Sequence, residues 1–440
     1  MQDQHTLHEL GRYRFVLVLF SVAVSLTLIF YLFPFTGISS QPNQVKRVFF
    51  VDNISNAHQL MVNRFNEIFA GQIEVVPISL PFEKFTTNER KELLTRTLRG
   101  MGGRIDVFAV DQIWVPRFAK WAEPLDSYFS NREMAELLPQ VVKTTNYQGD
   151  LVGIPLYLDV GVLYYRRDLI QQLPENESII EQLNESISWL QLAEIRDQYF
   201  PGQPVYLFQG DDYEGLICNF LEVLGGNGGR LDLEQPTGLL TAEAAASLNL
   251  LRQFIYESGI SPEEVIHFNE NETYLYALQH DIPFFRAWPT QRGNSPIPDE
   301  LRWKVDQLAF APIPHFPGKE SKTIFGGWNL MLSKTSQMKP EAIEFIKFAS
   351  SIEAQRILYS SGGLLPVLKV FYSDEEFLSA HPDLGFLKGI IATGVHRPRH
   401  PDYTKISDLL SFQISQALQN NVTTETALSR AAENIIPLIR

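Results

Sequence analysis

The sequence has little cysteine and an excess of acidic over basic residues. Cys218 is the single cysteine in 440 residues, which excludes an intrachain disulfide. It lies in the apolar run 215–221, so we expect a buried and inert thiol. Lys and Arg total 37 against 51 Asp and Glu, a formal net charge of -14. Because affinity for nucleic acid comes mostly from cations that neutralise phosphates, DNA and RNA are not expected partners.

The sequence also lacks the motifs of common catalytic and metal sites. No G-x-S-x-G elbow is present, and no partner residue marks Cys218 as a nucleophile. His396 and His400 have the spacing of metal ligands on a helix, but Pro398 stands between them and favours a surface turn. The glycine cluster 225–229 lacks the spacing of a phosphate loop. We expect no catalytic residue, no metal and no cofactor.

Long apolar runs are rare, and one of them is informative. Residues 15–35 carry no charge and follow Arg12 and Arg14. This length spans a bilayer and exceeds the apolar region of a usual cleaved signal, so an uncleaved signal anchor with an external body is the first interpretation. Small residues at 37–39 would allow a signal peptidase to cut after the apolar run. The alternative to a membrane segment is a buried core helix. No cysteine follows the run to carry a lipid.

Alternating strand and helix patterns begin after this segment. Residues 45–51, 73–80 and 105–110 read as buried strands separated by amphipathic helices. Such alternation predicts an α/β lobe with a mostly parallel sheet. Ligands of these sheets bind beyond the carboxyl ends of the strands, where Asp52 and Asp111 fall.

The middle and end of the chain predict a second, helix-rich lobe. Residues 147–168 form a β-branched and aromatic run interrupted by Gly153, Pro155 and Gly161, typical of strands that cross between lobes. Helical periodicity then appears at 189–200, 213–224, 241–255, 406–418 and 427–436.

The segment 323–333 joins a glycine pair to an indole. Gly326 and Gly327 permit close approach of backbone beside Trp328, and an indole in such a notch can cover the apolar face of a ligand. A helix with Pro340 at its first turn follows. The alternative is a strand end with a core tryptophan, because glycine in a strand often marks only a bulge.

Several separated motifs occur in one order along the chain. They are the segments 106–114, 161–168, 285–289, 326–329 and 397–403. Together they resemble the extracytoplasmic solute-binding proteins of ABC importers, specifically the branch with the trehalose/maltose-binding proteins. The resemblance covers essentially everything from Val45 to Ile439 and implies two α/β lobes that close on ligand by hinge motion.

The resemblance also implies domain limits. Residues 1–40 would be the tail and the anchor or signal segment. The first lobe would comprise 44–156 and 324–370, and the second 157–323 and 371–440.

A disaccharide offers hydroxyl groups and apolar ring faces, so its site needs carboxylates or amides, cationic donors and aromatic plates. On a helix capped by Asn88, Arg90 shares the buried face with Leu94, whereas Lys91 and Arg96 fall on the solvated face. Arg90 is therefore a candidate donor.

By resemblance, the ligand contacts would be Arg90, Asp111, Trp288, Gly327, Trp328 and Arg397. Four of these have an ordinary structural alternative: Arg90 as a snorkelling surface residue, Asp111 as a helix cap, Trp288 as core and Arg397 as a surface residue.

Further candidates lie on the crossover run and in the first loop. Asp159 and Tyr157 could line the cleft, although Asp159 could instead accept backbone amides at a strand bend. The first loop lacks the acidic residue that relatives often carry there, and Asn53, Asn56 or His58 could substitute.

The expected function is to bind a disaccharide or small oligosaccharide outside the cytoplasm, as a monomer, and to deliver it to an ABC permease. Residues 15–35 would hold the chain at the membrane. One alternative is a membrane-tethered sugar sensor. Another is a glycoside hydrolase using Asp111 and Asp159, but no glutamate stands in a plausible acid setting nearby.

Overall fold

The structure is a computed structural model that describes residues 45–80, 87–100, 105–233 and 236–439. The elements described below all belong to one compact unit, Lys46–Arg440. Among the described residues, no helix has the length and apolar character needed to cross a membrane. The expected anchor, residues 15–35, lies outside the described residues.

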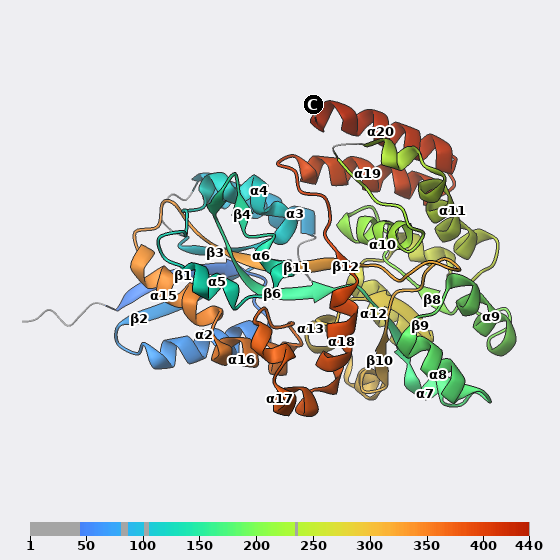
Figure 1. Ribbon diagram of the computed structural model, residues 1–440, viewed down its shortest axis with the longest axis horizontal. Coiled ribbons are helices and arrows are strands. Elements are labelled where there is room, and N and C mark those ends of the chain that lie inside the picture. Colours follow the sequence, from blue (N-terminus) through green and yellow to red (C-terminus); the bar gives the residue numbers. More distant parts are fainter. Residues whose placement is uncertain (1–44, 81–86, 101–104, 234–235, 440) are drawn as a thin grey trace, which may run out of the picture. The chain divides into compact units, whose positions relative to one another are not determined.

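A six-stranded sheet forms the first lobe (Figure 1). Its strands are β1 (Lys46–Asp52), β2 (Ile73–Ser79), β3 (Val107–Asp111), β6 (Ile154–Val160), β11 (Thr323–Leu332) and β12 (Gly394–Val395). The order is β12-β11-β3-β1-β2, and β6 pairs with β11 as well. β1 is parallel to β2 and β3, but β11 is antiparallel to both β3 and β6. The sheet is therefore mixed, with three parallel pairings, β11–β12 among them, and two antiparallel pairings made by β11, which returns from the second lobe.

Helices cover this sheet. They include α2 (Asn56–Ile68), α3 (Thr87–Gly100), α4 (Val115–Phe118), α5 (Asn131–Ala135), α6 (Pro139–Val142), α15 (Lys339–Ala349) and α16 (Ile352–Gly362). The rings of Phe50, Phe65 and Phe345 meet with centroids 5.2 and 5.4 Å apart, which joins β1, α2 and α15 in one core. α3 is described from Thr87 to Gly100, and the expected capping by the Asn88 side chain lies outside the described side chains.

A four-stranded sheet with the order β10-β7-β9-β8 forms the second lobe. Its strands are β7 (Val162–Arg166), β8 (Tyr206–Leu207), β9 (Phe284–Ala287) and β10 (Leu308–Ala311). Outside this sheet, a hairpin of β4 (Asn146–Tyr147) and β5 (Asp150–Leu151) contacts α4 of the first lobe. Cys218 is buried nearby in α10 (Glu214–Gly225), as expected, and burial raises the pKa of its thiol.

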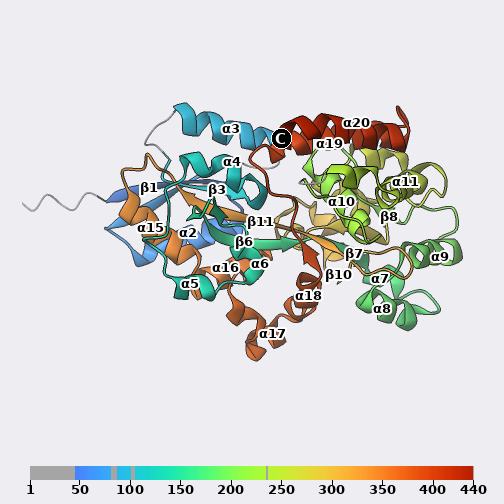
Figure 2. The same cartoon turned by 45° about the horizontal axis from the view of Figure 1, so that its top comes forward.

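The remaining helices confirm the helix-rich character of the second half. They are α7 (Arg167–Ile170), α8 (Asn176–Glu185), α9 (Trp189–Tyr199), α11 (Ala242–Tyr256), α12 (Glu270–Gln279), α13 (Gln291–Asn294), α14 (Arg302–Val305), α17 (Glu375–Ala380), α18 (Pro382–Ala392), α19 (Tyr403–Leu418) and α20 (Thr424–Ile439). α19 and α20 lie side by side next to α10 and α11 (Figure 2).

The chain passes from one sheet to the other at Gly161. β6 pairs with β11, and after this single residue β7 pairs with β9 and β10. The Gly161 amide donates to the Ile324 carbonyl at 3.1 Å, so the two crossing strands are bonded to each other at this point.

Candidate functional site

Three candidate residues from distant parts of the sequence form one row across the first sheet. On β11, Trp328 stands opposite Asp111 of β3 on one side and opposite Tyr157 of β6 on the other. Cross-strand neighbours in such pairs are about 5 Å apart at Cβ. The sheet register therefore places an indole between a carboxylate and a phenol.

Trp328 is buried, with 8 % of its surface exposed. Its ring meets the ring of Trp114 edge to face at 5.4 Å, and the Arg90 guanidinium lies over it at 4.4 Å. The indole is therefore packed into the first lobe beside Arg90 and opposite Asp111, and its role as a plate for a ligand stays a prediction.

Arg90 is buried on α3 and is not a snorkelling surface residue. Its Nη2 atom lies 3.4 Å from Oδ1 of Asp52, at the carboxyl end of β1. The expected helix faces were wrong for Lys91, which is also buried and lies 3.7 Å from Asp408 of α19. This lysine faces a helix from the end of the chain, and periodicity within α3 gives no sign of such a contact.

Asp52 and His58 add titratable groups beside Arg90. His58 Nε2 lies 3.6 Å from Asp52 Oδ2, and among the described residues neither atom has a hydrogen-bond partner. Burial raises the pKa of Asp52 to about 7, although Arg90 acts in the opposite direction. Burial and the charge of Arg90 lower the pKa of His58 to about 4. Buried polar atoms normally have partners, so these two are candidates for contact with a polar ligand.

Each glycine of the β11 pair accommodates a different neighbour. A Cβ atom on Gly326 would lie 3.0 Å from the Trp288 ring and 3.2 Å from the Asp159 side chain. A Cβ atom on Gly327 would lie 2.5 Å from the Tyr157 carbonyl oxygen, and φ at this residue is +121°. Glycine is required at Gly327 by backbone conformation and at Gly326 by the indole packed against it.

Trp288 follows β9 and is only partly buried. The Arg286 guanidinium lies 3.9 Å from its ring centroid. Arg286 is itself fully buried and forms two 2.9 Å hydrogen bonds with the Glu222 carboxylate of α10. This bidentate pair fixes the guanidinium, and the guanidinium supports one face of the indole.

Arg397 is buried and joins the two lobes, so it is not a surface residue. Its Nη2 atom donates to Asp111 at 2.9 Å, and its Nη1 atom donates to Glu214 of α10 at 2.8 Å. Tyr403 donates to the same Glu214 carboxylate at 3.0 Å, and Ser407 also bonds it. Asp111 additionally accepts the Ile113 amide at 3.1 Å, so it is a cap and an ion-pair partner together.

Asp159 is buried at the end of β6. Its Oδ2 accepts the Thr290 hydroxyl at 2.6 Å, and its Oδ1 accepts the Val160 amide at 3.1 Å. Burial outweighs these bonds and the charge of Arg286, and it raises the pKa of Asp159 to about 7. Asp159 therefore accepts a backbone amide, as the alternative interpretation held, while its side chain borders Gly326.

The first-loop candidates lie at the edge of this cluster. Asn53 is half-buried, and its backbone amide donates to Asp52 at 2.6 Å. Asn56 is the exposed first residue of α2. His58, in the first turn of α2, forms a capping box with Ser55 and brings its ring nitrogen to 3.6 Å from Asp52 Oδ2.

Two residues that pair with the arginines of the site, Glu214 and Glu222, are not among the candidates from the sequence. Both lie on α10, which reads as an apolar core helix, and both are buried. An acidic residue within an apolar helix is a usable signal, because a buried carboxylate needs a cationic partner. The sequence does not say which arginine supplies it. The part of the chain described here contains no group of three or more His, Cys, Asp or Glu side chains arranged to hold a metal.

The sequence also matches a known family over most of the chain. Residues 52–356 match the model of the family described as bacterial extracellular solute-binding protein. The chain belongs to this family. Its members bind substrates for ABC transporters and are not enzymes, which confirms the expected class and rejects the glycoside hydrolase.

Individual relatives agree with this assignment. A probable ABC transporter-binding protein of Deinococcus radiodurans is 25% identical over 358 residues, 78% of this chain and 82% of the relative. A mannitol-binding protein of Pseudomonas aeruginosa is 21% identical over 415 residues, 87% of this chain and 91% of the relative.

Solved structures share the two-lobe fold. Maltose-bound MalE3 of T. maritima superposes with a TM-score of 0.77 at 27% identity, covering 90% of this chain and 100% of that one. A solute-binding protein of Agrobacterium vitis with bound D-mannitol has a TM-score of 0.69 at 20% identity, covering 90% and 98%. The two-lobe α/β fold expected of this solute-binding protein is therefore confirmed.

Proposed function

We propose that this solute-binding protein binds a sugar between its two lobes and delivers it to an ABC permease. The observation that carries the proposal is the pair of indoles beside the Gly326–Gly327 backbone, Trp288 from the second lobe and Trp328 from the first. Aromatic plates from both lobes suit the apolar faces of a pyranose, and the neighbouring Asp52, His58 and Asp159 suit its hydroxyl groups.

The proposed ligand is a disaccharide or small oligosaccharide. Maltose is the ligand in the T. maritima relative, and D-mannitol is bound in the A. vitis structure. Contacts would come from Arg90, Asp111, Asp159, Trp288, Gly327, Trp328 and Arg397, with Asn53 and Asn56 at the entrance. The space enclosed by Asp52, Arg90, Trp114 and Trp328 is about 10 Å³, which suits no more than a water molecule. Sugar binding at this point therefore requires the side chains or the lobes to move apart.

The ion pairs of Arg397 oppose such a separation of the lobes. Arg397 bonds Asp111 of the first lobe and Glu214 of the second in the present arrangement. A sugar hydroxyl that contacts Asp111 or Arg397 would replace part of this bridge. Binding would then exchange one set of charge-assisted bonds for another, and the reaction would be association without chemistry.

The test is calorimetry and thermal unfolding of the full-length chain with maltose, trehalose and mannitol. A ligand that binds only the folded state raises the unfolding temperature. Trp288→Ala should weaken binding by about 30-fold, the effect of an aromatic hot spot of roughly 2 kcal/mol. Trp303→Ala is the matched control, because Trp303 is 54% exposed on α14. Hydrolysis of the sugar, or no response to any sugar or sugar alcohol, would refute the proposal.

We also propose lobe limits of 44–156 with 324–370 and 157–323 with 371–440. The change of sheet at Gly161 and the pairing of β11 with β6 support boundaries in these regions. Limited proteolysis tests them: ligand should protect the segments around both crossings, and cleavage unaffected by ligand would contradict them.

We further propose that residues 15–35 anchor the chain, as a monomer, to the cytoplasmic membrane with its body outside. The support is the charge-free length of this segment after Arg12 and Arg14. After fractionation, the full-length chain should remain in carbonate-washed membranes and be open to external protease. A soluble chain that starts near Ser40 would refute the anchor and leave the location intact.

A further inference from the structure

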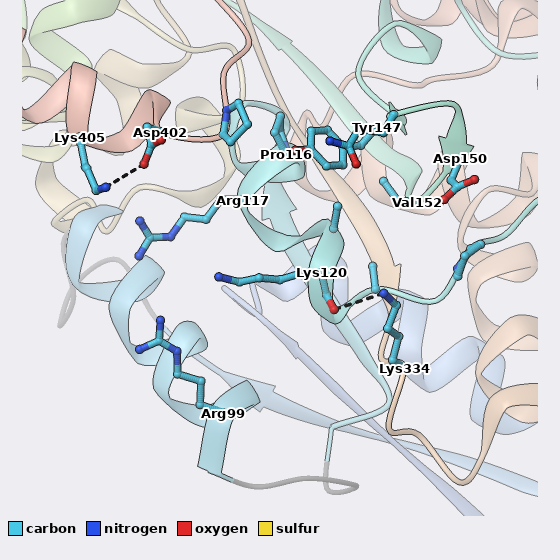
Figure 3. A pocket seen from close by; sticks show the side chains of 15 residues that line it. Arg99, Pro116, Arg117, Lys120, Tyr147, Asp150, Val152, Lys334, Asp402 and Lys405 are labelled. Atoms are coloured by element: carbon cyan, nitrogen blue, oxygen red, sulfur yellow. Dashed lines mark hydrogen bonds and ion pairs between the residues drawn. The ribbon is translucent and has the colours of Figure 1, made fainter. Parts of the chain in front are cut away.

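A pocket of about 650 Å³ lies outside the proposed sugar site. It is bordered by α3, α4, the 3-10 turn η2 (Ala119–Trp121), the β4–β5 hairpin and the start of α19. Five basic residues line it: Arg99, Arg117, Lys120, Lys334 and Lys405. In Figure 3 the side chains of Arg99, Arg117 and Lys120 extend into the same space. Such a gathering of cations stands out in a chain of net charge -14.

Three of these cations are held by uncharged groups. Lys120 Nζ lies 4.2 Å from the ring centroid of Trp121, and the Arg99 guanidinium lies 5.9 Å from it. Lys334 Nζ donates to the Lys120 carbonyl oxygen at 3.3 Å. In the described part of the chain, no carboxylate lies within 4.0 Å of Arg99, Lys120 or Lys334. Neutral partners orient these side chains without cancelling their charge.

The other two cations are already paired. Arg117 bonds Glu92 at 2.9 Å and the Thr404 hydroxyl at 3.0 Å, and Lys405 bonds Asp402 at 2.8 Å. Asp150 lies at the opposite end of the pocket lining (Figure 3). Within the described residues, the cations without a carboxylate partner therefore gather at Trp121 and the neighbouring Lys120 carbonyl, and like charges held this close repel one another until an anion lies between them.

We propose that this pocket binds a phosphate group, from a small phosphorylated molecule or from a lipid headgroup. The Arg99 guanidinium supplies paired donors, and Lys120 and Lys334 supply further positive charge, which together suit a multiply charged tetrahedral anion. The volume lies in the range of small-molecule sites. The pocket shares no residue with the proposed sugar contacts, so the inference stands independently of the proposed function.

The experiment uses the full-length chain with inorganic pyrophosphate as the probe. Calorimetry at low ionic strength measures the binding. The pocket variant is Arg99→Glu with Lys120→Glu, because both side chains are exposed and neither has a carboxylate partner among the described residues. The control is Lys319→Glu with Arg430→Glu, two exposed cations on other elements with the same change of net charge. Unfolding temperatures verify that all three proteins are folded.

The second arm measures co-sedimentation of the chain lacking residues 1–44 with phosphatidylglycerol vesicles, using phosphatidylcholine vesicles for comparison. The unfolding temperature first verifies that this shortened chain is folded, since described elements begin only at Lys46.

We expect pyrophosphate to bind the native chain and the control, and to bind the pocket variant at least about tenfold more weakly. If no protein binds pyrophosphate but the pocket variant alone loses binding to phosphatidylglycerol vesicles, the phosphate site is supported and its ligand is a lipid headgroup. Equal affinity of the pocket variant and the control in both arms, or no binding in either arm, would overturn the inference. Sugar affinity should be the same in all variants.

Discussion

Replacing Gly161 with alanine perturbs the point where the chain crosses between the sheets. A Cβ atom at this residue would lie 1.9 Å from Glu222 Oε1 and 2.8 Å from Arg286 Nη2. Contacts this short do not occur, so Glu222, or the strand that carries the new methyl group, has to shift by about 1 Å, as in an overpacked core. Glu222 has little freedom, because Oε1 also accepts the Ile324 amide at 3.2 Å.

The loss of stability depends on whether the core shifts to accept the methyl group or the Glu222–Arg286 ion pair breaks. Overpacking a well-packed core costs typically about 1–3 kcal/mol. If relief requires Glu222 to leave Arg286, the cost rises toward about 3–5 kcal/mol, the penalty for breaking a buried ion pair. We therefore expect Gly161→Ala to lower the free energy of unfolding by about 3 kcal/mol.

Urea unfolding monitored by tryptophan fluorescence measures this change. The matched control is Gly385→Ala in α18, where an added Cβ meets no atom within 4 Å, so it should be neutral or stabilise by up to about 1 kcal/mol. Adding Glu222→Asp shortens the obstructing side chain by one methylene, and the double variant should lose less than the sum of the single changes. Equal stability of Gly161→Ala and Gly385→Ala would show that the crossing tolerates the methyl group and that the steric reasoning is wrong.

Three further predictions concern buried residues of the site. Trp328→Ala should cost about 3–5 kcal/mol in urea unfolding through the cavity it leaves, and a cost under about 1 kcal/mol would contradict its packed position. For Asp159, the folded pKa of about 7 exceeds the ordinary value of 3.8, so its contribution to stability is complete below about pH 4 and is lost as pH rises through 7. Relative to Asp159→Asn, the native chain should lose stability by up to about 4 kcal/mol over that range in thermal unfolding, and a parallel pH dependence would exclude the raised pKa. Arg397→Met should destabilise by about 3–5 kcal/mol because Glu214 and Asp111 lose their cation, and adding Glu214→Gln should recover part of it; additive losses would show that the pair is not coupled.

Local patterns were sufficient for the elements and for much of the candidate set. The strand and helix periods located β1, β2, β3 and the long helices to within a few residues. The run through Gly161 was interpreted as a crossing, and the chain changes sheet at that residue. These features depend on hydrophobic spacing and on glycine, which act over a few residues.

The sheet register was not available from such patterns. That Trp328 stands between Asp111 and Tyr157 depends on β11 returning antiparallel between β3 and β6, from more than 160 residues away in sequence. Lys91 shows the same limit, since the Asp408 carboxylate 3.7 Å away lies on a helix near the end of the chain.

The sequence alone therefore determined the class of the protein, its alternation of strands and helices, and the residue types that can hold a sugar. Only the tertiary structure decided which charges face each other. It paired Arg286 with Glu222 and Arg397 with both Asp111 and Glu214. The physical reason is that the energy of a buried charge depends on what lies within a few ångströms of it. Those neighbours are brought together by chain crossings that local periodicity does not encode.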